Sequence, residues 1–326
     1  MMRRRDFTTG LLAGAATLGP WPPARAQAPM PVVGLLRMTS ATDSAHLVAA
    51  FREGLSESGF VEGQNVAIDY RFADNDRGRA PRLASELVAR RVAVIATDQG
   101  AREAKAATAE TPILFVLGAD PVALGLVASL NRPGGNVTGV VFLSSQLGAK
   151  RIELLRQLVP TASMIGVLAF PNSAEDSTER AQVEAAAKTL GQPILIADAV
   201  HDGEIDQAFA GFAEKGVGAV LVGSGPFFRS HKEQIVALAA RYRLPTSYSL
   251  REYVEAGGLM SYGTSITNAY RQAGIYAARI LKGEKPADLP VMQSTKFEFV
   301  INTKAAKALG LTVPQSLLVA ADDVVE

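Results

Sequence analysis

Hydroxyl, amide and carboxylate side chains follow several apolar segments of this chain, at the points where strands are expected to end. Such groups can bind a small polar ligand through hydrogen bonds, and neighbouring helix N-termini favour a carboxylate. Ligands of open α/β sheets lie beyond the carboxyl ends of the strands, so these positions form one candidate site. The candidate ligand-binding residues are Ser40, Thr97, Gln99, Asp120, Asn172, Ser224, Tyr248 and Glu252.

Each candidate also has a purely structural explanation, because Ser, Thr, Asp and Asn after a strand often cap the following helix. Asp120 precedes Pro121, a favoured first residue of a helix, so we interpret it first as a helix cap and second as a ligand contact. Glu252 follows Tyr248 in an expected loop and is the candidate partner of a ligand ammonium group. A solvated carboxylate in a first helical turn is the alternative for Glu252.

The candidates divide between two expected sheets. Ser40, Thr97 and Gln99 of the first are expected to hold the polar end of the ligand near helix N-termini. Aromatic side chains near the second could form walls for a ring or an ammonium group, although an aromatic at a strand end can also belong to the core. These candidate walls are Phe170, Phe227, Phe228, Tyr248 and Tyr262.

Catalytic patterns are missing from the sequence, so we expect no enzyme, no cofactor and no metal. There is no cysteine, and the three histidines, His46, His201 and His231, are far apart without a ligand-like partner at helical spacing. The Gly223-Ser224-Gly225 segment differs from the Gly-x-Ser-x-Gly of a nucleophile elbow. An α/β hydrolase therefore remains only as a less favoured alternative.

Charge and the N-terminal segment restrict the location and the partners. The 33 basic and 32 acidic residues give no basic excess for nucleic acid. Residues 1–26 resemble an export signal, with Arg3-Arg4-Arg5, a short apolar run and a small-residue cleavage site that ends at Ala26. Arg4-Arg5 also fits a twin-arginine signal, with the general secretory signal as the alternative. We expect a periplasmic protein.

The elements that position these residues alternate between two periods. Short apolar segments typical of buried parallel strands are followed by amphipathic segments typical of helices, and this alternation predicts an α/β fold with doubly wound parallel sheets. The predicted strands include residues 32–36, 92–96, 113–117, 137–142, 165–169, 194–196, 219–222 and 259–262. The predicted helices include residues 43–58, 150–159, 175–190, 203–215, 227–243 and a long helix capped by Ser265 or Thr267 that ends at Gly283.

Four segments also carry a family resemblance. They are residues 252–290, with the Gly257-Gly258 break and the long helix; Gly54-Leu55 to Gly63-Gln64-Asn65-Val66; Asp120-Pro121-Val122 to Asn131-Arg132-Pro133-Gly134-Gly135-Asn136; and Lys307-Ala308-Leu309-Gly310-Leu311-Thr312-Val313-Pro314. In this order and spacing the chain resembles the ABC-transporter substrate-binding proteins of the tryptophan/tyrosine-binding kind. The resemblance implies a type I periplasmic-binding fold with two lobes joined by a hinge. We assign residues 31–143 and 262–287 to the first lobe, and 144–261 and 288–326 to the second.

The resemblance implies that the protein is the solute-binding component of an ABC importer, captures a small ligand by hinge closure and delivers it to an inner-membrane permease. The ligand is expected to be an aromatic or another amino acid, and the protein is expected to be a monomer. Asn172, Ser224, Tyr248 and Glu252 would reach the ligand after closure. A ligand sensor for a membrane signalling protein is the alternative that the sequence leaves open.

Overall fold

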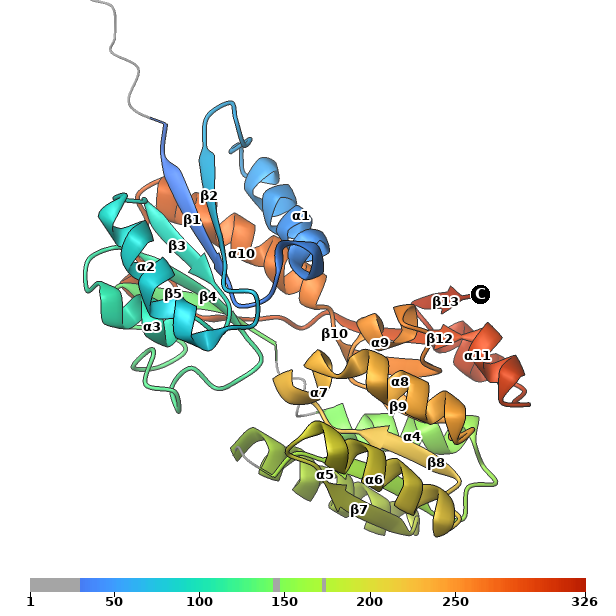
Figure 1. The fold of residues 1–326 in the computed structure, drawn as a ribbon. Coiled ribbons are helices and arrows are strands. Elements are labelled where there is room, and N and C mark those ends of the chain that lie inside the picture. Colours follow the sequence, from blue (N-terminus) through green and yellow to red (C-terminus); the bar gives the residue numbers. More distant parts are fainter. Residues whose placement is uncertain (1–29, 143–146, 172–173) are drawn as a thin grey trace, which may run out of the picture. The chain divides into compact units, whose positions relative to one another are not determined.

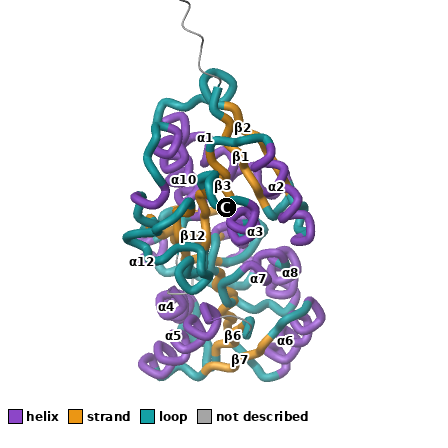
Figure 2. The backbone as a smooth tube through the Cα atoms, turned by 90° about the vertical axis from the view of Figure 1, so that its left-hand side faces the viewer, coloured by secondary structure: helices purple, strands orange, loops and turns teal. Residues whose placement is uncertain are grey.

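The structure is a computed structural model that describes residues 30–142, 147–171 and 174–326 (Figure 1). The expected signal segment, residues 1–26, and the candidate Asn172 lie outside these described residues. Within them, no helix is both long and apolar enough to cross a membrane. The elements form two sheets, each with helices on both faces (Figures 1 and 2).

The first sheet is made of β1 Val32–Arg37, β2 Ala67–Phe72, β3 Val94–Thr97, β4 Ile113–Leu117, β5 Val137–Val141 and β11 Met292–Gln293. All its pairings are parallel, in the order β11-β5-β4-β3-β1-β2. Strands β3, β4 and β5 are buried along their whole length, because apolar side chains fill both faces of a parallel sheet that lies between helices. The carboxyl ends of β1 and β3 therefore lie side by side.

The helices around the first sheet are α1 Ala41–Glu57, α2 Ala80–Ala89, α3 Ala101–Ala107 and α10 Ile266–Leu281, with the 3-10 turns η1 Arg77–Arg79 and η3 Pro286–Asp288. Helices α1 and α10 pack on one face of the sheet, and α2 and α3 pack on the other. Ser265 caps α10 by accepting a hydrogen bond from Asn268 N, which settles the cap in favour of Ser265 over Thr267.

Helices α1 and α10 lie against each other (Figure 1), and their backbones approach closely at two glycines. A Cβ atom added to Gly54 of α1 would lie 1.9 Å from the carbonyl oxygen of Arg271. One added to Gly274 of α10 would lie 2.1 Å from the carbonyl oxygen of Phe51. Because real Cβ atoms never come so close to backbone, only glycine fits at these two positions. The long helix after the Gly257-Gly258 break is therefore fastened directly to the first helix of the chain.

The second sheet is made of β6 Ile165–Ala169, β7 Ile194–Asp198, β8 Ala219–Val222, β9 Thr246–Tyr248, β10 Met260–Thr264, β12 Phe297–Asn302 and β13 Asp323–Val325. Its order is β13-β12-β10-β9-β8-β6-β7. The β10–β12 pair is antiparallel and differs from the all-parallel expectation, while the other pairings are parallel. The difference arises because the chain enters β12 from the first sheet through residues 294–296, without a crossover helix.

The helices around the second sheet are α4 Gly148–Leu158, α5 Ala174–Leu190, α6 Asp202–Glu214, α7 Pro226–Ser230, α8 Lys232–Arg241, α9 Arg251–Glu255, α11 Thr303–Ala308 and α12 Gln315–Ala320. Helices α4, α5, α11 and α12 pack on one face of the sheet. Helices α6, α7, α8 and α9 pack on the other. The predicted α/β fold with two helix-covered sheets is confirmed, and the pairings are parallel except for β10 with β12.

The predicted strands 113–117, 165–169 and 219–222 match β4, β6 and β8 residue for residue. Strand β2 was missed because it is an edge strand in which Asp69 and Arg71 interrupt the apolar run. The single helix predicted over 227–243 is two helices, α7 and α8, separated at His231. The His231 ring takes part in a 2.8 Å hydrogen bond with the carbonyl oxygen of Phe227, which closes α7 locally.

The chain passes between the sheets three times: after β5, between β10 and α10, and between β11 and β12. These passages are bonded to one another, since Ser265 N donates to the Lys296 carbonyl oxygen at 2.9 Å. Ser294 N donates to the carbonyl oxygen of Val141 at 2.8 Å. The end of β5 and the other two connections therefore lie side by side where the two sheets are joined.

Sheet membership differs from the expected lobe boundaries at two places. Residues 262–264 belong to β10 of the second sheet, although the first lobe was expected to begin again at residue 262. Residues 292–293 belong to β11 of the first sheet, although the second lobe was expected to begin again at residue 288. Strand pairing carries both segments past the expected positions. That the two parts move as lobes stays a prediction.

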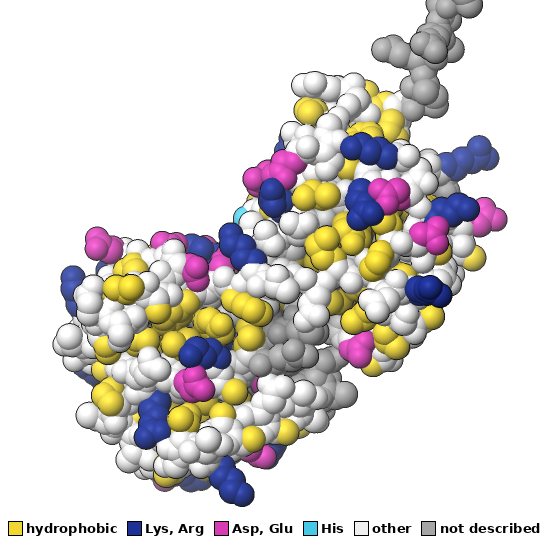
Figure 3. Space-filling view, turned by 180° about the vertical axis from the view of Figure 1, so that it is seen from behind, with side chains coloured by type: hydrophobic (Ala, Val, Ile, Leu, Met, Phe, Trp, Pro, Cys, Tyr) yellow, Lys and Arg dark blue, Asp and Glu magenta, His cyan; other side chains and the backbone are white. Residues whose placement is uncertain are grey.

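Figure 3 shows one face of the molecule with its charges coloured by sign. Lysine and arginine side chains alternate there with aspartate and glutamate, and apolar atoms lie between them. This mixture agrees with the nearly equal totals of 33 basic and 32 acidic residues. On this face no broad basic surface of the kind that binds nucleic acid is present.

Candidate functional site

A buried ion pair lies at the carboxyl edge of the first sheet. Arg37 ends β1 and is 1% exposed. Its Nη1 lies 2.9 Å from Oδ2 of Asp98, the residue that follows β3. Oδ1 of Asp98 accepts a hydrogen bond from Met38 N at 3.2 Å. The carboxyl ends of β1 and β3 are thus joined by an ion pair between the last residue of β1 and the first residue after β3.

Two helices hold the same guanidinium in place. Arg37 Nε donates to Oγ of Ser44 on α1 at 3.2 Å, and its Cζ lies 4.7 Å from the ring centroid of Tyr270 on α10. Burial lowers the pKa of Arg37 below its usual value, and the attraction of Asp98 offsets part of this effect. Arg37 is therefore held by α1, by α10 and by the residue that follows β3, and it is covered from solvent.

Of the candidates at this edge, Gln99 is accessible and Thr97 is not. Gln99 is exposed and accepts a 3.0 Å hydrogen bond from Arg77 through Oε1, which leaves its Nε2 as a donor for another group. Thr97 is 2% exposed, and its hydroxyl has no hydrogen-bond partner in the described structure. Ser40 caps α1, because its Oγ accepts from Asp43 N at 3.2 Å. The structural explanation therefore applies to Ser40.

Asp120 caps a set of turns instead of the helix that the sequence indicated. Its Oδ1 accepts a hydrogen bond from Val122 N at 2.8 Å, and Leu124 N donates to its carbonyl oxygen at 3.0 Å. Residues 121–125 form hydrogen-bonded turns and no helix. Gly125, with a φ of 68°, helps to end this segment before a helix can extend. Asp120 therefore caps the following backbone as predicted, but the segment that it caps is a set of turns and the predicted helix is wrong.

A second ion pair lies at the carboxyl edge of the second sheet. Arg229 of α7 donates from Nε and Nη2 to the two carboxylate oxygens of Glu252, both at 2.9 Å. Burial opposes ionisation of this carboxyl group, but hydrogen bonds from His46 and Arg229 outweigh it and lower the pKa of Glu252 to about 2. The Arg229 side chain is 26% exposed, and its Nη1 remains as a donor toward solvent.

Glu252 therefore differs from the unpaired loop carboxylate that the sequence indicated. It lies in the first turn of α9 and is bonded to Arg229, so a ligand ammonium group would have to share it. His46 of α1 also approaches it, with 3.4 Å between Nε2 and Oε1. Contact of Glu252 with a ligand stays a prediction. The sequence alone treated His46 as a surface residue, and it is 48% exposed.

Two phenylalanines form an aromatic surface beside Arg229. The rings of Phe170, which follows β6, and Phe227 of α7 are stacked with centroids 4.9 Å apart. Both are partly exposed, whereas Phe228 is fully buried. Tyr262 stacks on Phe297 within the sheet and packs against the core. Of the candidate walls, Phe170, Phe227 and Tyr262 therefore remain partly exposed, and the first two form one stacked surface.

The remaining candidates of the second sheet are internal. Tyr248 is 1% exposed, stacks on Tyr253 with centroids 4.7 Å apart, and has its pKa raised above the usual value by burial. Ser224 is 6% exposed and bonds to the carboxylate of Glu179 through both its N–H and its hydroxyl. Both residues support the edge of the sheet from within. Their contact with a ligand stays a prediction.

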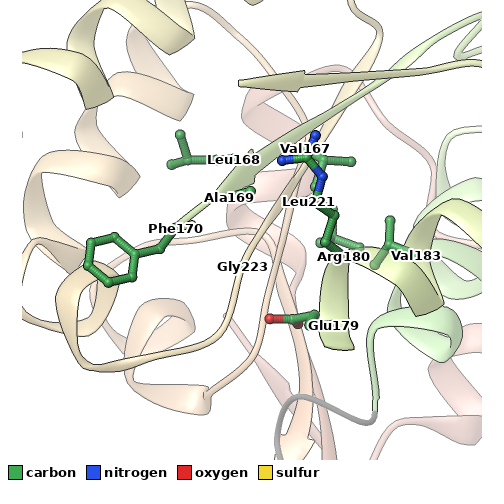
Figure 4. A pocket seen from close by; sticks show the side chains of 9 residues that line it. All are labelled: Val167, Leu168, Ala169, Phe170, Glu179, Arg180, Val183, Leu221 and Gly223. Atoms are coloured by element: carbon green, nitrogen blue, oxygen red, sulfur yellow. The ribbon is translucent and has the colours of Figure 1, made fainter. Parts of the chain in front are cut away.

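Cavities do not by themselves identify the site. A cavity of about 10 Å³ beneath the ends of β6 and β8 has room for about one water molecule (Figure 4). Figure 4 shows the Phe170 ring directed away from Arg180 and Val183, which line the other side of this cavity. A hollow of about 310 Å³ lies along β7 and α6, apart from Arg229 and Phe227. The candidate site is therefore defined by its accessible groups.

Together, the two edges offer amide and guanidinium donors, shared carboxylates and a pair of stacked rings. Sequence reasoning missed Arg37 and Arg229, the charged members of both edges. Arg37 had a detectable signal, because an arginine that ends an apolar strand must be paired when it is buried. No group of three or more His, Cys, Asp or Glu in the described ranges is arranged to hold a metal ion.

Comparisons with known proteins identify the family. The family model described as ABC transporter substrate binding protein matches residues 33–325. The chain belongs to this family. This substrate-binding protein is also 28% identical over 264 residues to a curated relative named tyrosine-binding protein from Clostridioides difficile strain R20291. The match covers 80% of this chain and 75% of the relative.

Solved structures give the same result. A Streptococcus pneumonia ABC domain in complex with L-Trp is 27% identical, with a TM-score of 0.79, over 90% of this substrate-binding protein and 99% of that chain. A conserved domain protein from Vibrio cholerae O1 biovar El Tor is 26% identical, with a TM-score of 0.78 over 90% and 99% of the two chains. The ligand-free, open structure of a Clostridium difficile substrate binding protein with adhesive properties is 25% identical, with a TM-score of 0.72 over 91% and 99%.

Proposed function

We propose that this substrate-binding protein captures an amino acid with an aromatic side chain and presents it to the permease of an ABC importer. The curated relative is named tyrosine-binding protein, and a structural relative is in complex with L-Trp. The observation that carries the proposal is that one short helix, α7, carries both Phe227, which stacks on the partly exposed Phe170, and Arg229, which pairs with Glu252. An aromatic amino acid carries a ring, together with a carboxylate and an ammonium group on the same Cα atom. The phenylalanine pair can pack against the ring, and the Arg229–Glu252 pair can bind the two charged groups.

In this proposal the ring of the ligand packs against Phe227, and its carboxylate accepts hydrogen bonds from Arg229 Nη1 and Gln99 Nε2. Its ammonium group shares Glu252 with Arg229. The charged groups at the two edges form balanced pairs, Arg37 with Asp98 and Arg229 with Glu252, so the site favours a ligand without net charge. A zwitterionic amino acid is such a ligand.

The location and the partner belong to the same proposal. The basic, apolar and small-residue pattern of residues 1–26 supports export, with delivery to a permease in the inner membrane. The hydrogen bonds from Ser265 N to the Lys296 carbonyl oxygen and from Ser294 N to the Val141 carbonyl oxygen support a hinge, because short connections bonded to one another allow bending more readily than sliding. Closure by such a hinge would bring Gln99 and Arg229 to one ligand. We propose that the protein works as a monomer.

Calorimetric titration of the chain that begins at Gln27 with L-tryptophan and L-tyrosine tests the proposal. D-tryptophan, indole and a pentose serve as controls that lack the stereochemistry, the charges or the ring. A ligand at 100 times its dissociation constant should stabilise the protein by about 2.7 kcal/mol in a parallel thermal shift. Binding of the pentose alone, or conversion of any probe to a product detected by mass spectrometry, would contradict the proposed function.

A further inference from the structure

A buried ion pair lies beneath the loop between β8 and α7. Arg151 of α4 is 0% exposed, and its Nη1 donates to the carbonyl oxygen of Val222, the last residue of β8, at 2.6 Å. Its Nη2 bonds to Glu179 Oε1 of α5 and lies 3.2 Å from Ser224 Oγ. Glu179 accepts hydrogen bonds from Ser224 N at 2.7 Å and from Ser224 Oγ at 3.0 Å. Side chains of α4 and α5 therefore hold the loop between β8 and α7 through hydrogen bonds to Val222 and Ser224.

This arrangement is a poor way to stabilise a fold. Removing two charges from water costs several kcal/mol per ion, and well-packed apolar residues in the same place are often as stable or more stable. The contacts instead hold the backbone and the side chain of one loop, through the carbonyl oxygen of Val222 and both donors of Ser224. What the pair determines is therefore the position of this loop.

The loop is also confined by its own residues. A Cβ atom on Gly223 would lie 2.9 Å from the carbonyl oxygen of Leu168 on the neighbouring strand. Gly225 has a φ of 124°, a conformation that side chains rarely allow. Helix α7 begins immediately afterwards and carries Phe227 and Arg229. A shift of the loop would therefore move both groups relative to Phe170 and Glu252.

We propose that Arg151 and Glu179 are positioning residues that fix the aromatic ring and the guanidinium of α7 for the ligand without touching it. This inference rests on the proposed function for its ligand, but the ordering of the loop can be measured without one. Glu179 of α5 and Gly223 of the loop both line the small cavity that Figure 4 shows. Because that cavity holds about one water molecule, the ligand does not reach Glu179 there.

The experiment compares five variants with the wild type: Arg151→Met, Glu179→Leu, the double variant that combines them, Ser224→Ala, and Glu184→Gln as the control. Glu184 lies on α5 as Glu179 does, but it forms an exposed pair with Arg180. We expect the double variant to unfold at a denaturant concentration closer to that of the wild type than either single substitution does, because it leaves no unpaired buried charge. Ser224→Ala is the milder variant, since it keeps the bond from Ser224 N to Glu179.

Two readouts separate positioning from stability. Hydrogen exchange of the ligand-free double variant should be faster by about tenfold at amides 223–230 and unchanged in β1, β3 and α1. Its dissociation constant for L-tryptophan should rise by about tenfold or more, the equivalent of one hydrogen bond to a charged group. Ser224→Ala should show the same changes to a smaller extent, and Glu184→Gln should show neither.

Each possible result decides between the proposals. Two results would overturn the positioning role. One is that amides 223–230 of the folded double variant exchange at the wild-type rate. The other is that these amides exchange faster while the affinity for L-tryptophan stays at the wild-type value. If the wild type binds neither L-tryptophan nor L-tyrosine, the proposed function fails, and the exchange measurement still decides whether the pair orders the loop. If the double variant does not fold, Ser224→Ala supplies both readouts, and unchanged values there would overturn the inference.

Discussion

The carboxyl edges of the two sheets differ in the number and the exposure of their ion pairs. At the first edge, Arg37 is covered, is held by α1 and α10, and joins the ends of two strands through Asp98. At the second edge, the covered pair of Arg151 and Glu179 lies below the loop, and a separate pair, Arg229 with Glu252, remains partly exposed above it. Among the described residues, the first edge therefore has the buried Arg37–Asp98 pair. The second edge has a buried pair that holds the loop after β8 and a partly exposed pair that a ligand could reach.

This difference concerns the groups that each edge leaves accessible. The first edge offers an amide, Gln99, whereas the second offers the Phe170 and Phe227 rings and the Arg229 guanidinium. In the proposed function, a ligand side chain would therefore be selected mainly at the second edge. Substitutions at both edges test this distinction.

The same substitution at both edges should have unequal consequences. Arg37→Met leaves Asp98 buried without its partner and should lower the free energy of unfolding by about 3–5 kcal/mol. Arg229→Met removes a partly exposed partner of Glu252 and should lower it by about 1.5–3 kcal/mol. Denaturant unfolding at pH 7 measures both changes. Equal losses would show that the two pairs are buried alike.

Glu252 should contribute stability that depends on pH. Its pKa is about 2 in the folded chain and 4.5 ordinarily, so its contribution is complete above pH 4.5 and is lost as the pH falls to about 2. The contribution should reach at most about 3 kcal/mol. Wild type and Glu252→Gln should therefore differ most in unfolding free energy above pH 4.5 and converge near pH 2. Parallel curves over this range would contradict the ion-paired state of Glu252.

One face of the first sheet is covered by α1 and α10, whose backbones approach closely at Gly54 and Gly274. Gly54→Ala forces the helices apart and should destabilise the protein by about 1–3 kcal/mol, as overpacking does. Gly211→Ala on α6 is the matched control, because its Cβ meets nothing within 4 Å, and it should be neutral or stabilising by up to about 1 kcal/mol. Thermal unfolding of both variants measures this. Similar melting temperatures for the two would contradict the close crossing.

The smallest expected effect distinguishes a cap from a ligand contact. Ser40→Ala removes the N-cap of α1 and should destabilise the protein by about 1 kcal/mol. Its affinity for L-tryptophan should stay at the wild-type value, because the hydroxyl is occupied by Asp43. Thermal unfolding and calorimetry measure the two quantities. A loss of affinity larger than the loss of stability would assign Ser40 to the ligand instead.

The fold was predictable because apolar strands and amphipathic helices leave strong periodic patterns. Strand β4, buried on both faces, was predicted to the residue, whereas the edge strand β2, with Asp69 and Arg71, has no continuous apolar run. The antiparallel entry of β12 depends on pairing between segments far apart in the sequence, which no local pattern encodes. Local patterns thus predict elements better than they predict partners.

The candidate site was predictable only in outline. The rule that ligands lie beyond strand ends indicated Gln99 and Phe227, which are accessible at the two edges. It could not show that Glu252 forms an ion pair with Arg229, because this depends on the position of α7 relative to α9. Nor could it tell that Thr97 and Tyr248 are covered, because burial is decided by the surrounding helices. Residue types predicted the chemistry, and tertiary contacts decided which groups remain available.

The central claim, that both edges bind one aromatic amino acid, is tested most directly by calorimetric titration of L-tryptophan into Gln99→Ala and Phe227→Leu. Gln99 represents the first edge, Phe227 represents the second, and neither substitution removes a fully buried partner. The account predicts that each variant binds at least about tenfold more weakly than the wild type, with the fold retained. Wild-type affinity in either variant would contradict it, because one edge would then take no part in binding.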